Sequence, residues 1–128
     1  DLVFSCPPYY CLEVYEEGGN QLSRLPDYGS FLEQMSLCIS NCYRILKPGR
    51  FMCFVVADFR HKGDLISFSS DFISAAKSKG LKHWDTVIIK NFSPFAALQM
   101  GKVAAKRYTS KIHEYLLVFR KPELKEGL

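Results

Sequence analysis

The sequence lacks any long hydrophobic run, since its longest uninterrupted apolar stretch, residues 51–57, is seven residues in a chain of 128. A helix that crosses a bilayer needs about 20 such residues, so we expect no membrane partner. The chain does not open with a basic segment followed by an apolar one, and nothing therefore predicts a signal peptide. Five cysteines, an odd number, are consistent with reduced thiols, and we expect a cytoplasmic protein.

Paired spacing of metal ligands is also missing from the sequence. His61, His83 and His113 stand singly, and Cys38 and Cys42 share a helical spacing without two further ligands. Because a structural zinc site needs four ligands, we expect no bound metal. The cysteines are better interpreted as small buried side chains, with Cys6, discussed below, treated separately.

What the sequence does contain is the composition of a globular unit, with 48% hydrophobic, 14% aromatic and 23% charged residues. A chain of this length forms one domain at most. It opens on Asp1 and an apolar segment that resembles a core strand. We therefore expect residues 1–128 to form a single but incomplete domain, of unknown oligomeric state.

Apolar residues alternate between helix-like and strand-like patterns along the chain. A period of three to four residues covers residues 30–46 and again 65–79, and breaker residues follow each of these segments. Apolar runs rich in strand-forming residues cover residues 1–5, 50–59, 81–91 and 112–121. The run at 50–59 is nearly continuous, which is typical of a strand buried on both faces.

The order of these elements predicts an α/β fold. Strands that alternate with helices form a mostly parallel sheet with helices on its faces. The last strand follows the third without a helix between them, so we expect it to run antiparallel. The chain is either one compact α/β unit or half of a larger doubly wound domain.

The first expected strand ends in residues 5–10, SCPPYY. In open α/β sheets, ligands bind outside the carboxyl ends of the strands. The two prolines stiffen the backbone and donate no hydrogen bond, which leaves nearby carbonyls available as acceptors, and Tyr9 supplies a ring. This arrangement suits a flat heterocycle with an exocyclic amine. A Pro-Pro turn with a surface tyrosine is the alternative from these residues alone.

Residues 1–10, DLVFSCPPYY, resemble the catalytic motif of the amino-group DNA methyltransferases, which act on adenine N6 or cytosine N4. Residues 10–15, 44–51 and 113–121 resemble later segments of the same family and occur in the same order. The resemblance covers nearly the whole chain. It implies a partial Rossmann-like, S-adenosylmethionine-dependent methyltransferase fold.

The resemblance also implies direct transfer of a methyl group from S-adenosylmethionine to the amine of a base flipped out of double-stranded DNA. Cys6, Pro7, Pro8 and Tyr9 would form the catalytic motif. In that motif Tyr9 stacks on the flipped base, the Pro7 carbonyl accepts one amino hydrogen, and the residue at position 6 accepts the other.

On the cofactor side, the resemblance implies that Ser5, Cys6 and Asp58 lie near S-adenosylmethionine. The sequence departs from the family pattern twice. Position 6 is Cys instead of Asp, Asn or Ser, and a thiol is a weak hydrogen-bond acceptor. The eight glycines never fall two apart, so the Gly-x-Gly loop of the cofactor half is missing. We expect the chain to be the catalytic half, inactive by itself.

Charge is distributed unevenly along the chain. Residues 1–35 carry one arginine against six acidic residues, whereas the remainder carries 16 cations against seven acids. Residues 90–111 hold five cations and no acid, which predicts either phosphate contact or a solvated loop. With DNA as the implied substrate, we expect residues 92–111 to be a basic loop between the last two strands. The expected DNA contacts are Tyr10, Lys102, Lys106, Arg107 and Lys111.

Other functions remain open from the sequence. A similar motif serves RNA or protein-glutamine methyltransferases, and a non-catalytic nucleic-acid-binding remnant of the fold is a further alternative. The sequence does not distinguish adenine from cytosine as the target. Nor does it distinguish a restriction-modification enzyme from a phage enzyme.

Overall fold

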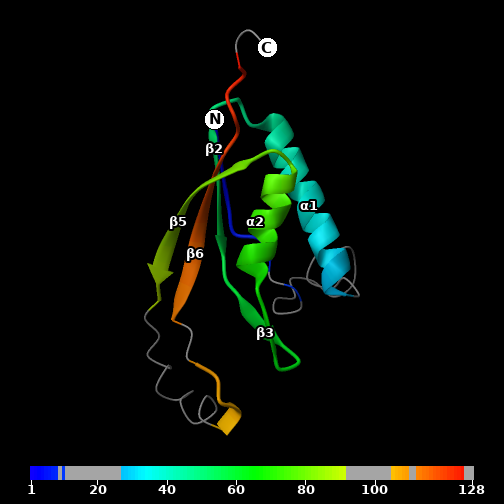
Figure 1. The fold of residues 1–128 in the computed structure, drawn as a ribbon, viewed down its shortest axis with the longest axis vertical. Coiled ribbons are helices and arrows are strands. Elements are labelled where there is room, and N and C mark those ends of the chain that lie inside the picture. The colour runs from blue at the N-terminus through cyan, green and yellow to red at the C-terminus, as the bar shows by residue number, and fades with distance from the viewer. Residues whose placement is uncertain (9, 11–26, 92–104, 110–111, 126–128) are drawn as a thin grey trace.

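A computed structural model describes residues 1–8, 10, 27–91, 105–109 and 112–125 of the chain, and it contains two helices and six strands within these ranges (Figure 1). In chain order the elements are β1 (Leu2–Ser5), α1 (Tyr28–Ile45), β2 (Phe51–Val56), β3 (Phe59–His61), β4 (Asp64–Ile66), α2 (Phe68–Ser78), β5 (Lys82–Lys90) and β6 (His113–Arg120). The four strands and two helices expected from the sequence are all present, with shifted ends.

Four strands form a mixed sheet in the order β1-β2-β6-β5. Strand β1 pairs with β2 in parallel, with Phe4 opposite Cys53, whereas β6 is antiparallel to both β2 and β5. The antiparallel last strand is confirmed, and it lies inside the sheet between β2 and β5. Strands β1, β2 and β5 consequently point the same way, but only the β1–β2 pairing is parallel and the other two are antiparallel. The prediction of a mostly parallel sheet is therefore wrong for the described strands, because β6 is inserted between β2 and β5.

Both helices cover the same face of this sheet (Figure 1). Burial alternates along β2, where Met52, Phe54 and Val56 are buried and the residues between them are only half-buried. The prediction that this strand is buried on both faces is wrong for the described part of the chain, as is the prediction of helices on both faces. The cause is that the buried residues of both helices pack into one core cluster. Those residues are Phe31, Met35 and Ile39 of α1 and Phe68, Phe72 and Ala76 of α2.

A β-hairpin stands where the sequence predicted the start of the second helix. Strands β3 and β4 pair antiparallel, with Phe59 opposite Ile66, and Lys62 and Gly63 form the two-residue turn. Both turn residues have positive φ, 51° and 89°, the backbone that such tight hairpins require. Leu65 therefore lies in a strand, and α2 begins only at Phe68.

Polar contacts fix both ends of α1. At the start, the Asp27 carboxylate accepts a hydrogen bond of 2.7 Å from the Ser30 backbone N–H, a typical N-cap. At the end, Lys121 Nζ donates to the carbonyls of Tyr43 (2.7 Å) and Leu46 (2.8 Å). These bonds satisfy carbonyls that the helix leaves unpaired and hold the end of α1 against the chain that follows β6.

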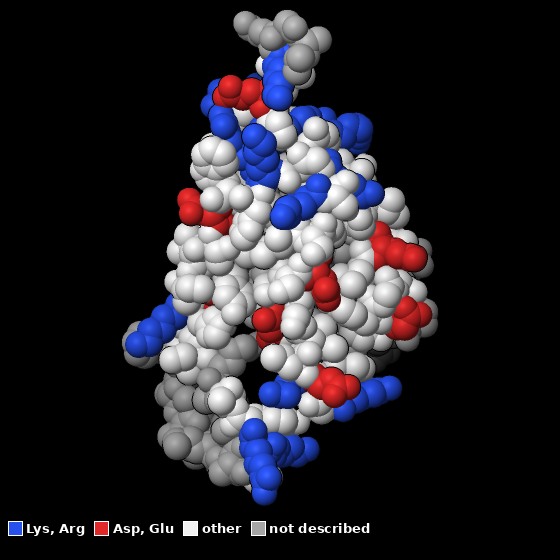
Figure 2. All heavy atoms as spheres, in the orientation of Figure 1, with Lys and Arg blue, Asp and Glu red and all other residues white. Residues whose placement is uncertain are grey.

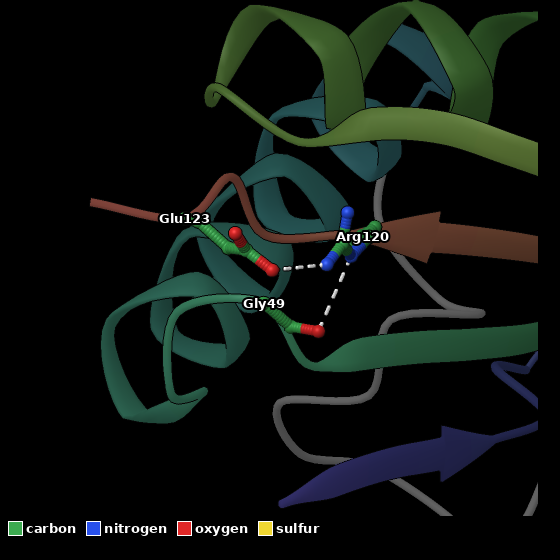
Figure 3. A network of polar contacts seen from close by, with 3 residues as sticks. All are labelled: Gly49, Arg120 and Glu123. Carbon is green, nitrogen blue, oxygen red and sulfur yellow. Dashed lines mark hydrogen bonds and ion pairs between the residues drawn. The ribbon is translucent and has the colours of Figure 1, made fainter. Parts of the chain in front are cut away.

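Arg120, the last residue of β6, joins two loops beside that contact (Figure 3). Its Nε donates to the Gly49 carbonyl at 3.3 Å, and its Nη2 donates to Glu123 at 2.5 Å. The guanidinium also lies over the Trp84 ring, 4.9 Å from its centroid. Arg120 thus fixes the loop between α1 and β2 and, through it, the position of β2. Among the described helices, none has the length and apolar character needed to cross a membrane.

Candidate functional site

The candidate site lies where the parallel strands end. Since β1, β2 and β5 run in the same direction, their carboxyl ends meet at one edge of the sheet. Register places Ser5 opposite Phe54 and, on the other side of β2, Tyr115 opposite Val56. The residues after β1 and after β2 therefore emerge next to each other.

The segment after β1 combines a buried proline with exposed polar groups. Pro7 is buried and Pro8 half-buried, whereas Ser5 and Cys6 are exposed. Burial of Pro7 anchors the Pro-Pro segment in the core and leaves the Ser5 hydroxyl and the Cys6 thiol at the surface. The structure thus brings together four of the predicted site residues, and Tyr9 lies outside the described residues.

Tyr10, the next described residue, is part of the core. It is 7% exposed, and its ring centroid lies 5.7 Å from that of Phe31, 6.0 Å from that of Tyr28 and 5.4 Å from that of His61. Burial of the ring argues against the predicted DNA contact at Tyr10, and we do not include Tyr10 among the proposed contacts. Its structural effect is to hold the end of the motif against α1 and the β3–β4 hairpin.

Asp58, which follows β2, is a helix cap. Its Oδ1 accepts hydrogen bonds from the Ser69 backbone N–H (2.8 Å) and the Ser69 hydroxyl (2.7 Å). Ser67, the N-cap residue of α2, makes no capping bond with its side chain. Asp58 therefore satisfies the first turn of α2 and fixes it to the end of β2. The sequence suggested only a cofactor contact for this residue.

A second polar contact, between α1 and α2, was also not predicted from the sequence. The Tyr28 hydroxyl donates to Asp71 Oδ2 at 2.7 Å and so joins the start of α1 to the first turn of α2. Burial raises the pKa of Tyr28 well above its ordinary value, and the hydrogen bond to Asp71 and the charges of Asp71 and Asp58 raise it further. Tyr28 is therefore a neutral donor at physiological pH. No spacing could have indicated this pair, because its members are far apart in the sequence.

The thiols differ in their surroundings. Burial raises the pKa of Cys42, with a further contribution from Cys38, and burial alone raises the pKa of Cys53. These two thiols are half-buried, whereas Cys6 and Cys38 are exposed. Within the described ranges, no three His, Cys, Asp or Glu side chains are grouped as a metal site would require.

Of the predicted basic contacts, Lys106 and Arg107 are exposed. Lys102 and Lys111 lie outside the described residues, as does most of the segment 92–111. Tyr108, which follows Arg107, packs against the β3–β4 hairpin, with the Arg60 guanidinium 3.6 Å from its ring centroid. The structure therefore brings two of the predicted cations beside a hairpin that the sequence analysis did not expect.

The fold and the site define an α/β domain whose exposed polar groups and Pro-Pro segment share the carboxyl edge of the sheet. The family model described as DNA methylase, of the N6/N4 methyltransferase type, matches residues 1–126. The chain therefore belongs to the DNA methylase family. None of the curated proteins compared with the chain matches it.

Solved structures of TTHA0409 from Thermus thermophilus, described as a DNA modification methylase, have a similar fold. One has a TM-score of 0.68 at 24% identity and covers 99% of this chain. Another, complexed with S-adenosyl-L-methionine, has a TM-score of 0.67 at 22% identity. The chain spans only 48% and 47% of these two structures, respectively.

Proposed function

We propose that residues 1–128 are the catalytic half of an S-adenosylmethionine-dependent DNA methyltransferase that modifies the exocyclic amine of adenine or cytosine. The observation that supports this proposal best is the segment Cys6-Pro7-Pro8-Tyr9 at the carboxyl end of β1, with Pro7 buried and Cys6 exposed. In a member of the DNA methylase family, this is the edge of the sheet where a ligand is expected.

In the proposed reaction, the chain's own residues position the base rather than activate it. Tyr9 stacks on the flipped base, and the Pro7 carbonyl and the Cys6 thiol accept its two amino hydrogens. These contacts aim the lone pair of the amine at the methyl donor, and the proton released from nitrogen passes to water. S-adenosylmethionine, when bound, supplies an electrophilic methyl group on a sulfonium. Rate is gained mainly by orientation of the two reactants.

We propose that Ser5, Cys6 and Asp58 form part of the cofactor site. The exposed hydroxyl of Ser5 and thiol of Cys6 lie at the carboxyl edge of the sheet and offer hydrogen bonds to the amino-acid end of S-adenosylmethionine. Asp58 follows the neighbouring strand, with its Oδ1 bonded to Ser69. Because the chain spans about half of the solved relatives and lacks a Gly-x-Gly loop, we expect residues 1–128 alone to bind the cofactor weakly or not at all.

The substrate that fits this proposal is double-stranded DNA. Lys106 and Arg107 are exposed cations, and Lys102 and Lys111 belong to the same basic segment of the sequence. Contacts from such cations to phosphates supply affinity and position without reading the base sequence. We propose all four as phosphate contacts.

The test is transfer of a labelled methyl group from S-adenosylmethionine to duplex DNA by the intact protein, compared with Tyr9→Ala and Tyr9→Phe variants. Loss of the ring in Tyr9→Ala should lower the transfer rate by roughly 5- to 160-fold, since base stacking contributes roughly 1–3 kcal/mol. Tyr9→Phe keeps the ring and should keep most of the rate. The proposal is falsified if the parent methylates no DNA or if Tyr9→Ala matches the parent.

Two other functions remain as outcomes of that test. Cys6 is a weaker hydrogen-bond acceptor than the Asp, Asn or Ser of the family pattern at this position. This favours a non-catalytic, nucleic-acid-binding role as the second candidate. Binding of DNA without methyl transfer to any substrate would support it. Methylation of RNA or of a glutamine-containing protein, with none of DNA, would instead assign the third function.

A further inference from the structure

The β3–β4 hairpin and residues 105–109 are joined by one tyrosine ring and one carbonyl. The Arg60 guanidinium lies 3.6 Å from the centroid of the Tyr108 ring, and Arg60 Nη1 donates to the Gly63 carbonyl at 3.1 Å. The Tyr108 hydroxyl donates to the same carbonyl in a long bond of 3.5 Å. We call this group, Arg60, Lys62, Lys106 and Arg107 with the Tyr108 ring, the basic junction.

The basic junction presents its charge to solvent. Arg60, Lys62, Lys106 and Arg107 are all exposed, and none of them forms an ion pair with another residue in the described part of the chain. In the sequence, the nearest acidic residues are Asp58 and Asp64, each two residues from a hairpin cation, and Glu114, which follows Lys106 and Arg107. Blue side chains gather at the lower end of the molecule, where Figure 1 places the hairpin (Figure 2).

Two of these cations stand at backbone positions that suit other residues better. Lys62 (φ 51°) and Arg107 (φ 58°) are the only non-glycine residues with positive φ in the described ranges. Lys62 and Gly63 form a two-residue hairpin turn, in which asparagine at the first position relieves the steric conflict of a long side chain. Both Lys62 and Arg107 thus combine an unfavourable backbone conformation with an exposed positive charge in the same surface. This combination indicates that the charges serve a purpose other than folding.

Arg60 is held in place without losing its capacity to bind. The Tyr108 ring covers one face of the Arg60 guanidinium, and one N–H group on the edge of the guanidinium donates to the Gly63 carbonyl. A guanidinium has five N–H donors in a planar fork that matches the oxygens of a phosphate. The remaining donors of Arg60 are therefore pre-oriented for a phosphate.

The basic junction adjoins the proposed catalytic segment. His61 follows Arg60, and its ring lies 5.4 Å from the ring of Tyr10, which follows Tyr9 in the sequence. A base held by the Pro-Pro-Tyr segment would consequently have its neighbouring phosphates on the side of the hairpin. The exposed charge, the backbone strain and the position of the basic junction thus all favour a nucleic-acid phosphate as its partner.

We propose that the basic junction binds backbone phosphates of duplex DNA next to the base presented to the motif, with Arg60 and the turn residue Lys62 as contacts additional to Lys106 and Arg107. This inference rests on the proposed function for the nature of the partner. The ring of Tyr108 is the positioning element that keeps the hairpin cations and residues 106–107 in one surface.

The test separates charge from folding. In the intact protein, Lys62→Asn and Arg107→Asn together remove two cations but suit the left-handed backbone, so the midpoint of thermal unfolding should stay the same or rise. Binding to a fluorescent DNA duplex, measured without cofactor across a salt series, should weaken, and its log-log salt slope should fall by about two, roughly one for each lost phosphate contact. The matched control, Lys77→Gln with Lys82→Gln, removes two exposed cations near the other end of α2 and should keep the parental slope.

A second pair of variants tests the role of the ring. Tyr108→Ala keeps every cation, so the salt slope should stay near that of the parent while affinity falls severalfold from loss of orientation. Tyr108→Phe keeps the ring and should bind like the parent. An unchanged slope in the double asparagine variant, or an equal loss in the lysine control, overturns the inference even when methyl transfer to DNA is intact.

The same data distinguish failure of the proposed function. A reduced salt slope in the double variant, together with no methyl transfer by the parent, supports the phosphate surface and rejects the enzyme. A slope that falls on single-stranded RNA but not on duplex DNA rejects the DNA surface in favour of RNA.

Discussion

Cys6 is the residue on which the chemistry of the proposed site depends most. Its thiol is exposed at the end of β1, beside the buried Pro7, and a thiol accepts hydrogen bonds weakly. A carboxylate at this position would accept a charge-assisted bond from the amine, roughly twice as strong as a neutral one. The position therefore sets how firmly the amine is held, while the turn that carries it is fixed by proline.

We expect Cys6→Asp to increase methyl transfer to DNA in the intact protein, by about tenfold if the new bond contributes roughly 1.4 kcal/mol to the transition state. Initial rates with labelled S-adenosylmethionine measure this. The control is Cys38→Asp, which changes a second exposed cysteine, located on α1, and should leave the rate unchanged. A rate that does not respond to Cys6→Asp would show that position 6 does not contact the amine.

Tyr28 carries a prediction about pH. Because its pKa is raised in the folded state, the hydroxyl stays protonated there while the unfolded chain loses that proton near pH 10. The Tyr28–Asp71 hydrogen bond therefore stabilises the fold fully below about pH 10, and its contribution declines as the pH rises above that value. Tyr28→Phe should cost about 1–3 kcal/mol at neutral pH, since it leaves the Asp71 oxygen without its donor.

Urea unfolding of the parent and of Tyr28→Phe at several pH values tests this. The difference in unfolding free energy should be constant up to about pH 10 and shrink above it. Tyr108→Phe is the matched control, since it loses only a long bond in an exposed region and should show neither effect. A difference between parent and Tyr28→Phe that does not change with pH would contradict the assignment of this group.

At the scale of the element, Asp58 shows how a loop residue can set the position of a helix. Its hydrogen bonds to Ser69 replace the cap that Ser67 does not supply, and they hold α2 against the end of β2. We expect Asp58→Ala to lower the unfolding free energy by about 1–2 kcal/mol, whereas Asp58→Asn, which keeps an acceptor, should cost less. Denaturant unfolding of both variants measures this.

A cofactor contact at Asp58 would give a different pattern. Asp58→Asn would then preserve stability but weaken S-adenosylmethionine binding by the intact protein. Ser70→Ala, an exposed serine in the same turn of α2, is the control for both measurements. If Asp58→Ala is as stable as the parent, the residue does not cap the helix in solution.

Much of the element order follows from patterns within short windows of sequence. The period of apolar residues predicted α1 to within a few residues, since the breakers Pro48 and Gly49 follow it. The β3–β4 hairpin was missed because Leu65 fits the apolar period of α2, and a strand of three residues gives almost no pattern of its own. The turn residues Lys62-Gly63 were the available signal, weakened by lysine where asparagine is usual.

The candidate site was predictable only in part, and for a similar reason. Pro7-Pro8 directly after a strand is a local signal, and it indicated the edge of the sheet at which we propose the site. Contacts between distant residues, such as Arg60 with Tyr108 or Asp58 with Ser69, leave no trace in spacing. Tyr10 was among the expected DNA contacts, but its burial depends on α1 and the hairpin meeting around it.

At the scale of the whole molecule, the sheet has one covered and one open face among the described residues. Leu2 and Phe4 of β1 are 61% and 60% exposed, and Trp84 and Val87 of β5 are 50% and 48% exposed. Register places all four on the face opposite the helices, since each aligns with or contacts the half-buried residues of β2. Exposed apolar surface of this extent usually marks an interface.

The open face leads to a prediction for the polypeptide of residues 1–128 produced alone. We expect it to self-associate and to bind a hydrophobic dye, because burial of apolar area stabilises association by roughly 25 cal/mol per Å². Leu2→Ser with Phe4→Ser should shift the sedimentation profile towards monomer and reduce dye fluorescence. Leu37→Ser with Ile45→Ser, at similarly exposed positions on α1, is the control and should do neither. Equal effects of the two pairs would show that the open face is no more adhesive than the rest of the surface, and that its apolar residues need no partner.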